Sequence, residues 1–417
     1  MRKVIIDSYI PFEGHPFEGI AQVVQLPPEA ITPDAVRDAD ALIIRTRTRC
    51  NAALLDGSKV GIVATATIGT DHLDFPYLRS RGIRIVSAPG CNAPAVAQYV
   101  FASIFALGLG QPGMRLGVIG LGHVGSIVAS WARHFGMDVL ACDPPRANTH
   151  GGWNPDAPFS PDGWNTGDPF PPGSEPFFTV EQVAAKADVL TFHTPMIADG
   201  PYPTRHLLCR ELLDIAPKAM VINAARGPVA DTADLIAALR RGRVDHAAID
   251  CWEGEPNISP DLLRLAEITT PHIAGYSIEG KRRATTVTFN AVLDYLCNNA
   301  ECGMQNAECQ DRSTGAQELA GARYIAAAPG CPEAKPGEQE KGVALSSNRP
   351  CTADKNPAHH LQAGVPMTPP LAVSRQAVID SYDPLADSLP LKTTPSAFEA
   401  LRNHYPLRHE VQFLELR

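Results

Sequence analysis

Arg226, Glu255 and His272 each follow a short apolar run that is typical of a β-strand, and together they could bind an alcohol and take up its proton while it is oxidised. A hydroxyl group releases hydride from its carbon only if its proton also departs, so the reaction needs a base such as imidazole, whose pKa lies near neutrality. A carboxylate beside the imidazole would raise its pKa and fix which ring nitrogen faces the substrate. A guanidinium fork can grip a carboxylate through two hydrogen bonds. The three residues therefore predict acid–base chemistry on a hydroxy acid, although each alone could equally be structural.

A glycine-rich segment predicts a binding site for a dinucleotide. An apolar run at 116–119 leads into the sequence Gly-Leu-Gly-His-Val-Gly at 120–125, and a helical pattern follows at 127–135. The first glycine permits a tight turn, the second lets a pyrophosphate approach the backbone, and the third lets helix and strand pack closely. The phosphates would lie at the helix N-terminus. We therefore expect nucleotide contacts from Gly120, Gly122, His123, Val124 and Gly125.

Asp143 follows a second apolar run, about 20 residues after the glycines, where a carboxylate accepts hydrogen bonds from ribose hydroxyls. This carboxylate would repel the additional phosphate of NADP, so NAD is the expected cofactor. Arg146 lies nearby in the sequence and could weaken that preference.

Short apolar runs alternate with helical patterns across the first 300 residues, which predicts parallel sheets joined by crossover helices. In such sheets, ligands gather at the carboxyl ends of the strands. The longest apolar stretch, at 96–109, is shorter than the roughly 18 residues of a membrane span and predicts a buried helix. We expect strands at 4–6, 41–45, 60–65, 83–86, 116–119, 139–142, 189–192, 220–223, 247–250 and 268–269.

The chain is expected to divide into domains around these sheets. Residues 144–176 are rich in Pro, Gly, Asp and Asn and predict a long surface loop, whereas 396–405 predicts a helix capped by Ser396 with Glu399 at its third position. The predicted divisions are a substrate-binding domain at 1–95 with 275–297, an NAD-binding domain at 96–274, an irregular, potentially disordered insert at 298–375, and a dimerisation-like element at 376–417.

The composition narrows the class of protein. The 417 residues carry 45 acidic and 36 basic side chains, a formal net charge of -9, which argues against a nucleic-acid partner. The apolar stretches also argue against a membrane partner. Ten cysteines are scattered singly, as expected of reduced thiols in a cytoplasmic protein. The spacing of His359 and His360 from Cys331 and Cys351 fits no familiar ligand set, so no metal site is predicted.

Taken in order, the glycine motif and the Arg226, Glu255-Pro256 and Pro271-His272 segments resemble the D-isomer-specific 2-hydroxyacid dehydrogenase family, over residues 1 to about 297. Other segments are most similar to the branch that uses NAD to oxidise 4-phospho-D-erythronate in pyridoxal 5'-phosphate biosynthesis. The resemblance implies two Rossmann-like parallel-sheet α/β domains, one flavodoxin-like, with a small C-terminal α+β element and a homodimer. The segments of this second similarity are 69–72, 88–93, 193–195, 200–202, 272–281 and 398–408.

The resemblance also assigns roles to residues. It implies that Arg226 and Glu255 are active-site residues and that His272 donates and accepts the proton. A phosphorylated hydroxy acid would be the substrate, with Arg45, Lys281, Arg402 and Arg408 as candidates for holding its phosphate. The remaining implied contacts are with NAD at Asp143, Thr194, Asp250 and Gly275, and with substrate at Thr46, Thr67 and Tyr276.

Alternatives remain open at this point. The chain could act on another hydroxy acid, as 3-phosphoglycerate dehydrogenases and hydroxypyruvate reductases of the family do. It could also resemble the family's NAD-sensing co-repressors, which bind protein partners. The long loop after Asp143 and residues 298–375 depart from the family's usual pattern, which leaves the dimer geometry open.

Overall fold

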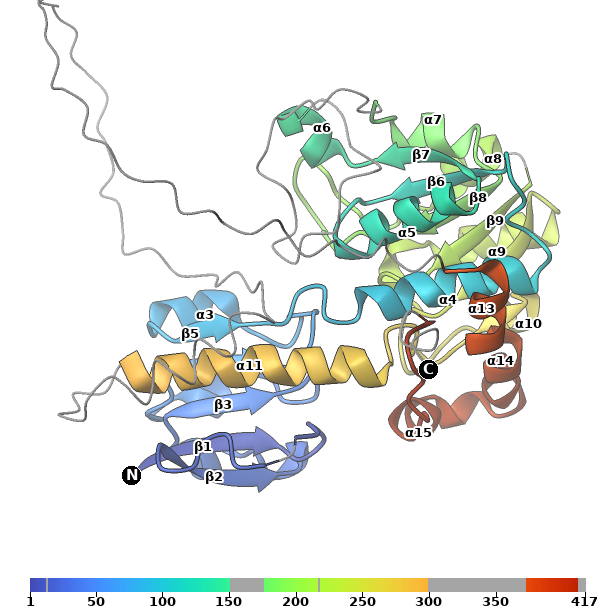
Figure 1. The fold of residues 1–417 in the computed structure, drawn as a ribbon. Coiled ribbons are helices and arrows are strands. Elements are labelled where there is room, and N and C mark those ends of the chain that lie inside the picture. The colour runs from blue at the N-terminus through green and yellow to red at the C-terminus, as the bar shows by residue number, and fades with distance from the viewer. Residues whose placement is uncertain (13, 151–175, 217, 299–372, 412–417) are drawn as a thin grey trace, which may run out of the picture. The chain divides into compact units, whose positions relative to one another are not determined.

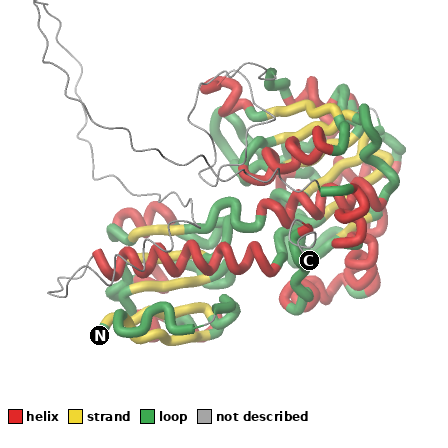
Figure 2. The backbone as a smooth tube through the Cα atoms, viewed as in Figure 1, coloured by secondary structure: helices red, strands yellow, loops and turns green. Residues whose placement is uncertain are grey.

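A computed structural model describes residues 1–12, 14–150, 176–216, 218–298 and 373–411 (Figure 1). Most of the expected loop after Asp143 and most of the expected insert lie outside these residues, as do Cys331, Cys351, His359 and His360. Figure 2 shows strands and helices alternating along the chain, as the apolar pattern predicts. Among the described residues, no helix is both long and apolar enough to cross a membrane.

The first sheet has five parallel strands in the order β2-β1-β3-β4-β5. The strand β2 was not predicted, because Gln22 and Gln25 interrupt its apolar residues and its side chains are only half-buried. The middle strand, β3, is apolar throughout, as both faces of a parallel sheet are covered. The strands are β1 (Arg2–Asp7), β2 (Ala21–Leu26), β3 (Ala41–Ile44), β4 (Ile62–Thr65) and β5 (Arg84–Val86).

Alternate residues of these strands face two separate cores. Leu42 and Val63 pack with the short helices on one face, whereas Ile43 and Ile62 pack with Phe289 of α11 on the other. Residues 278–297, expected to return to this domain, therefore supply a helix that covers it. The helices are η1 (Pro28–Ala30), α1 (Pro33–Val36), α2 (Ala52–Leu55), α3 (Phe75–Ser80) and α11 (Ile278–Asn298).

The second sheet has six parallel strands in the order β11-β10-β9-β8-β6-β7. The chain starts at β6, adds β7 on one side, and then returns to β8 on the other, which creates the switch point where such sheets bind ligands. The predicted strands 189–192 and 268–269 match β8 and β11 at both ends. The strands are β6 (Arg115–Ile119), β7 (Asp138–Cys142), β8 (Val189–Phe192), β9 (Ala219–Asn223), β10 (Val244–Ile249) and β11 (Ile268–Thr269).

Helices cover both faces of this sheet and bury two apolar cores. The expected buried helix at 96–109 is α4, nearly all of whose residues are buried. One expectation was wrong: residues 144–150 form α6 instead of irregular loop. The helices are α4 (Ala93–Ala106), α5 (His123–His134), α6 (Pro144–His150), α7 (Val180–Ala184), α8 (Arg210–Ile215), η2 (Gly227–Val229), α9 (Thr232–Arg240) and α10 (Pro260–Leu265).

The described part of the C-terminal element is helical, with one β-bridge between Ser277 and Arg408. The prediction that Ser396 caps this helix was wrong. Ser396 lies in a 3-10 turn that begins at Pro395, so α15 starts at Phe398 and has no side-chain cap. The elements are α13 (Arg375–Ser381), α14 (Pro384–Thr393), η3 (Pro395–Ala397) and α15 (Phe398–Asn403).

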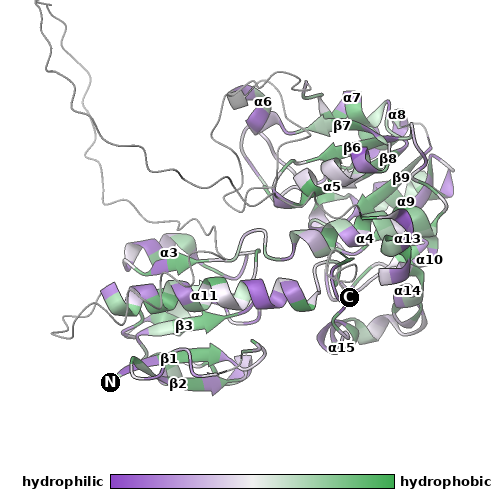
Figure 3. Ribbon diagram, in the orientation of Figure 1, coloured by the Kyte–Doolittle hydropathy of each residue, from purple (hydrophilic) through white to green (hydrophobic). Residues whose placement is uncertain are grey.

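The helix α14 lies against β11, the edge strand of the second sheet. The backbone N–H of Thr269 donates a hydrogen bond to the Ser388 hydroxyl at 2.8 Å. Leu391 and Phe398 are buried in one of the two apolar cores of the second sheet. In Figure 3 the strands of the sheet are apolar, whereas the helices mix apolar and polar residues. The C-terminal element therefore completes the second sheet's core.

Arg408 fastens the end of the described chain to this core. Its buried guanidinium donates hydrogen bonds to the carbonyls of Ile273 (3.1 Å), Ala95 (3.0 Å) and Ala274. It also lies 4.4 Å above the ring of Tyr382. Because these carbonyls bind both of its terminal nitrogens, Arg408 acts as a structural anchor.

Replacing Arg408 by Met keeps an unbranched stem but removes all three of these hydrogen bonds from a buried region. We expect Arg408→Met to lower the free energy of unfolding by roughly 1–3 kcal/mol, the cost of an unsatisfied buried polar group. Urea denaturation would measure the loss. The control is Arg264→Met, whose side chain is 72% exposed and which should change stability by no more than about 0.5 kcal/mol. Equal effects of the two substitutions would contradict the anchoring role.

Candidate active site

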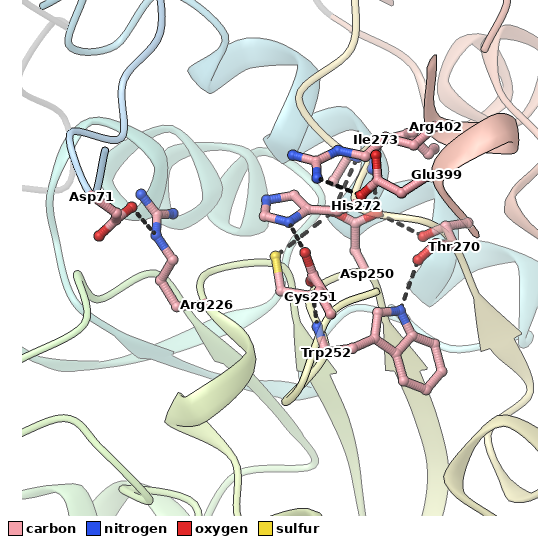
Figure 4. Close-up of polar contacts among 12 residues, drawn as sticks. Asp71, Arg226, Asp250, Cys251, Trp252, Thr270, His272, Ile273, Glu399 and Arg402 are labelled. Atoms are coloured by element: carbon pink, nitrogen blue, oxygen red, sulfur yellow. Dashed lines mark hydrogen bonds and ion pairs between the residues drawn. The ribbon is translucent and has the colours of Figure 1, made fainter. Parts of the chain in front are cut away.

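The predicted catalytic residues follow three neighbouring strands of the second sheet, at the side of the sheet where the carboxyl ends of the strands lie. Because β9, β10 and β11 are parallel, Arg226, Asp250 and His272, which follow them in turn, all lie at this edge. In Figure 4 the ring of His272 extends toward the side on which Arg226 lies. The strand order therefore places a guanidinium and an imidazole at the same edge of the sheet.

The His272 imidazole pairs with Glu255. Its Nδ1 lies 2.9 Å from Oε2 of the carboxylate, and Oε1 accepts a hydrogen bond from the backbone N–H of Trp252 at 2.7 Å. An ionised carboxylate only accepts hydrogen bonds, so Nδ1 carries the proton and donates it. The other nitrogen, Nε2, is left to exchange a proton with a substrate.

The environment shifts the pKa of both partners. Burial alone would lower the pKa of His272, but the adjacent Cys251 and the Glu255 carboxylate outweigh burial and hold it well above its usual value. Burial alone would raise the pKa of Glu255, but hydrogen bonding and charge from His272 lower it. Before substrate binds, the pair therefore favours an imidazolium beside a carboxylate.

Asp250 holds the loop that carries His272. Its buried carboxylate accepts hydrogen bonds from the Thr270 hydroxyl (2.7 Å) and from the backbone N–H groups of Ile273 (2.7 Å) and Ala274 (3.1 Å). His272 has a φ of 57°, a strained conformation for a residue with a side chain. These hydrogen bonds stabilise the strained loop, and the implied contact of Asp250 with NAD stays a prediction.

Arg226 lies against the loop that follows β4. Its Nε is 3.4 Å from Oδ2 of Asp71, and its Nη1 donates a hydrogen bond to the carbonyl of Ala225 at 2.8 Å. A Cβ added at Gly69 would lie 2.7 Å from Nη2 of Arg226, so a side chain there would push the end of the Arg226 side chain aside. A substrate carboxylate at Arg226 would replace the mostly exposed Asp71 as the anion.

The glycine loop has the geometry expected of a phosphate cradle. Gly120 has a φ of 91°, and a Cβ at Gly125 would lie only 1.9 Å from the carbonyl oxygen of Gly120. A Cβ at Gly122 would meet no atom within 4 Å, so this position is open to a ligand. The helix α5 begins at His123, whose ring lies against Gly90, and Val124 packs on the core.

Two further predicted contacts flank this loop. Asp143 accepts a hydrogen bond from the backbone N–H of Leu121 at 2.8 Å, and the side chain of Arg146 lies 3.6 Å from the same carboxylate. The hydroxyl of Thr194 is buried without a hydrogen-bond partner among the described residues, and its methyl group faces Gly120. Both residues therefore lie beside the cradle, as a dinucleotide would require.

Other predicted residues have different surroundings. A Cβ at Gly275 would overlap the amide of Asn92, so this glycine permits close packing. The Thr67 hydroxyl donates to the carbonyl of Gly69 at 3.0 Å and shapes the loop that carries Asp71. Thr46 is exposed beyond β3.

Tyr276 follows His272 closely in the sequence and contacts basic side chains. The ammonium of Lys281 is 5.3 Å from the centre of its ring, and Arg402 interacts with both Tyr276 and Glu255. The structure therefore brings part of the C-terminal element to the pair Glu255–His272.

Three residues that touch these groups were not predicted. Trp252 could have been found, because it lies in the same polar segment as Glu255, and its indole donates to the carbonyl of Thr270 at 2.9 Å. Asp71 carried only a weak signal, a place in a segment similar to the family. Cys251, next to His272, gave none, since the cysteines are scattered.

Comparison with known proteins decides the family. A family model described as "D-isomer specific 2-hydroxyacid dehydrogenase, catalytic domain" matches residues 7–303. The chain belongs to this family. Like the rest of the D-isomer-specific 2-hydroxyacid dehydrogenases, it is therefore a dehydrogenase, as predicted.

Two curated members of the family are similar over most of the chain. The erythronate-4-phosphate dehydrogenase of Bacteroides fragilis is 36% identical over 414 residues, which cover 98% of this chain and 97% of that protein. The erythronate-4-phosphate dehydrogenase of Serratia proteamaculans is 40% identical over 299 residues, 70% of this chain and 74% of that protein. The family model ends close to residue 297, where the family resemblance was expected to end, and the first alignment extends over nearly the whole chain.

Solved structures confirm the predicted α/β fold. The TT0316 protein from Thermus thermophilus is 25% identical, covers 72% of this chain and 98% of its own, and has a TM-score of 0.55. A D-lactate dehydrogenase from Aquifex aeolicus, complexed with NAD and lactic acid, is 22% identical, covers 71% and 96%, and has a TM-score of 0.54.

The charge of Glu255 should set the pH at which this dehydrogenase works. Oxidation needs neutral His272, so kcat/KM should rise as pH passes upward through its pKa. In Glu255→Gln the contribution of the carboxylate is lost while that of Cys251 remains, so the pKa of His272 falls and this acid limb should move to lower pH. Initial rates measured across pH would reveal the shift.

The control is Glu267→Gln, because Glu267 pairs with His246 (3.3 Å) at the opposite end of β10. Its acid limb should coincide with that of the unaltered protein. An unmoved limb in Glu255→Gln would refute the role of this carboxylate.

Proposed function

We propose that this protein oxidises 4-phospho-D-erythronate with NAD, giving (R)-3-hydroxy-2-oxo-4-phosphooxybutanoate, as a step of pyridoxal 5'-phosphate biosynthesis. The observation that carries the chemistry is the 2.9 Å pair of His272 and Glu255 at the sheet edge that Arg226 shares. The choice of substrate is supported by the relatives, two of which carry the name erythronate-4-phosphate dehydrogenase.

The residues around the glycine loop fit NAD. The open position at Gly122, the unpartnered hydroxyl of Thr194 and the Asp143 carboxylate would face the pyrophosphate and ribose. When bound, NAD would accept hydride from C2 of the substrate. Asp143 supports NAD over NADP, because a carboxylate beside the ribose repels a further phosphate.

The protein's own side chains would prepare the substrate for this transfer. Arg226 would exchange Asp71 for the substrate carboxylate and hold it through a fork of two hydrogen bonds. Nε2 of His272 would take the proton from the C2 hydroxyl, and the resulting imidazolium would be stabilised by Glu255. Asp250 would keep the ring in place during the proton transfer, because it fixes the loop on which His272 sits.

Lys281 and Arg45 are the best candidates for binding the substrate phosphate. Lys281 lies in the first turn of α11, where the helix dipole favours an anion. Burial, with a further contribution from the nearby charge of Arg45, lowers the pKa of Lys281 to about 8. A phosphate dianion bound there would offset the repulsion between these two positive charges. Arg402 lies nearer Glu255 and Tyr276, and Arg408 binds carbonyls.

We also propose a cytoplasmic homodimer. Ile379, Leu385 and Leu389 of α13 and α14 expose 41%, 42% and 66% of their surface, an apolar set that a second copy could cover. The described cysteines are all free thiols, which suits a reducing compartment. A monomeric mass by light scattering would refute the dimer.

A direct assay tests the function. Purified protein with NAD and 4-phosphoerythronate should raise the absorbance of reduced nicotinamide. Unphosphorylated erythronate and 3-phosphoglycerate should react much more slowly. Comparable rates with 3-phosphoglycerate would instead favour another activity of the family.

Variants tie this activity to the site. His272→Ala should lower kcat by about 10²–10⁴-fold, the usual contribution of general acid–base catalysis, while the affinity for NAD stays near normal. His246→Ala removes the imidazole of a different His–Glu pair, in which His246 of β10 contacts Glu267, and should leave kcat unchanged.

Loss of the Lys281 charge should affect the phosphorylated substrate selectively. Lys281→Met removes a charged hydrogen bond, so KM for 4-phosphoerythronate should rise roughly ten- to a hundredfold, while kinetics with unphosphorylated erythronate change little. Lys186→Met is the control, because Lys186 lies 5.5 Å above the Phe178 ring in a similar arrangement. Equal losses on both substrates would contradict a phosphate contact.

A further inference from the structure

The Cys251 thiol gives the pair Glu255–His272 a third metal-binding group. One ligand atom from each of these three side chains lies within 4.8 Å of the others. Figure 4 shows the Cys251 sulfur beside the ring of His272. Among the described residues, this is the one such cluster of at least three His, Cys, Asp or Glu side chains.

The three groups match the ligands that Zn²⁺ prefers. Zinc binds thiolate at about 2.3 Å, imidazole at about 2.0–2.1 Å and carboxylate at about 2.0–2.2 Å, in tetrahedral geometry. Such bonds set the ligand atoms about 3.3–3.6 Å apart. The 2.9 Å contact between Glu255 and His272 must open by a few tenths of an ångström, and the other separations, which are at most 4.8 Å, must close by no more than about 1 Å. Side-chain rotations are of this size.

The balance of charge favours the ion. Binding would release the thiol proton of Cys251 and the imidazolium proton where His272 carries one. The thiolate and the Glu255 carboxylate would then neutralise Zn²⁺, so no net charge is added to the half-buried site. Cys251 is 1% exposed, whereas the side chains of Glu255 and His272 are 19% and 30% exposed, so the ion would enter from their side.

We propose that Cys251, Glu255 and His272 form a Zn²⁺ site whose occupation blocks the enzyme. A metal ion bound there would occupy the His272 imidazole, which accepts the substrate proton, and the Glu255 carboxylate, which orients the imidazole. Proton transfer from the substrate would then stop. The inhibition rests on the proposed dehydrogenase function, but metal binding does not.

Cobalt tests the site without reference to activity. Co²⁺ added to the full-length protein should give a thiolate-to-cobalt absorption band in the near ultraviolet, which Zn²⁺ then removes. Cys251→Ser keeps the size of the side chain and should lose this band. Cys209→Ser, which alters a half-buried cysteine at the start of α8, should keep it. An equally strong band in Cys251→Ser would overturn the site and leave Cys251 as a packing residue.

Zinc inhibition tests the consequence, with each rate divided by the same protein's rate in EDTA. Zn²⁺ should inhibit the unaltered protein and Cys209→Ser reversibly, and inhibiting Cys251→Ser by half should take at least about tenfold more zinc, since a ligand is lost. Zinc that binds the unaltered protein without slowing it would overturn the inhibition. If EDTA-treated protein oxidises no hydroxy acid, the proposed function fails, while the cobalt result still decides the metal site.

Discussion

The buried carboxylate of Asp250 is the constraint on which the candidate site depends. It stands at the end of β10 and accepts three hydrogen bonds from the segment that follows β11. These bonds offset the strain of a left-handed residue at 272 and direct the imidazole toward Glu255. The indole of Trp252 binds the same segment, so two adjacent strands share one rigid junction. The chemistry of the imidazole therefore depends on a residue that need not touch substrate.

The strands and the nucleotide loop could be predicted because their signals are local. A parallel strand covered on both faces is a continuous apolar run, and the runs at 189–192 and 268–269 coincide with β8 and β11. The structure shows a steric requirement at Gly120, which has a positive φ, and at Gly125, which packs against the Gly120 carbonyl, while Gly122 borders open space. The order of polar residues after successive strands likewise sufficed to gather Arg226, Glu255 and His272 at one sheet edge.

The remainder depended on contacts between distant residues. Nothing in the sequence of β2, in which Gln22 and Gln25 interrupt the apolar residues, shows that a neighbouring strand pairs with it. Serine is a residue type that commonly caps helices, but Ser396 follows Pro395 within a 3-10 turn. Asp250 accepts hydrogen bonds from the segment that carries His272, and Cys251 lies near His272, because β10 pairs with β11. The spacing of residues along the chain does not encode this pairing.

The hydrogen bond from Thr269 to Ser388 has a consequence for the solubility of shortened chains. An edge strand whose backbone amides are bare can add a strand from another molecule, and natural proteins shield such edges. Here the shield is a helix from the far end of the sequence. A chain ending before residue 373 would leave β11 uncovered, so it would tend to self-associate through its sheets in addition to losing stability.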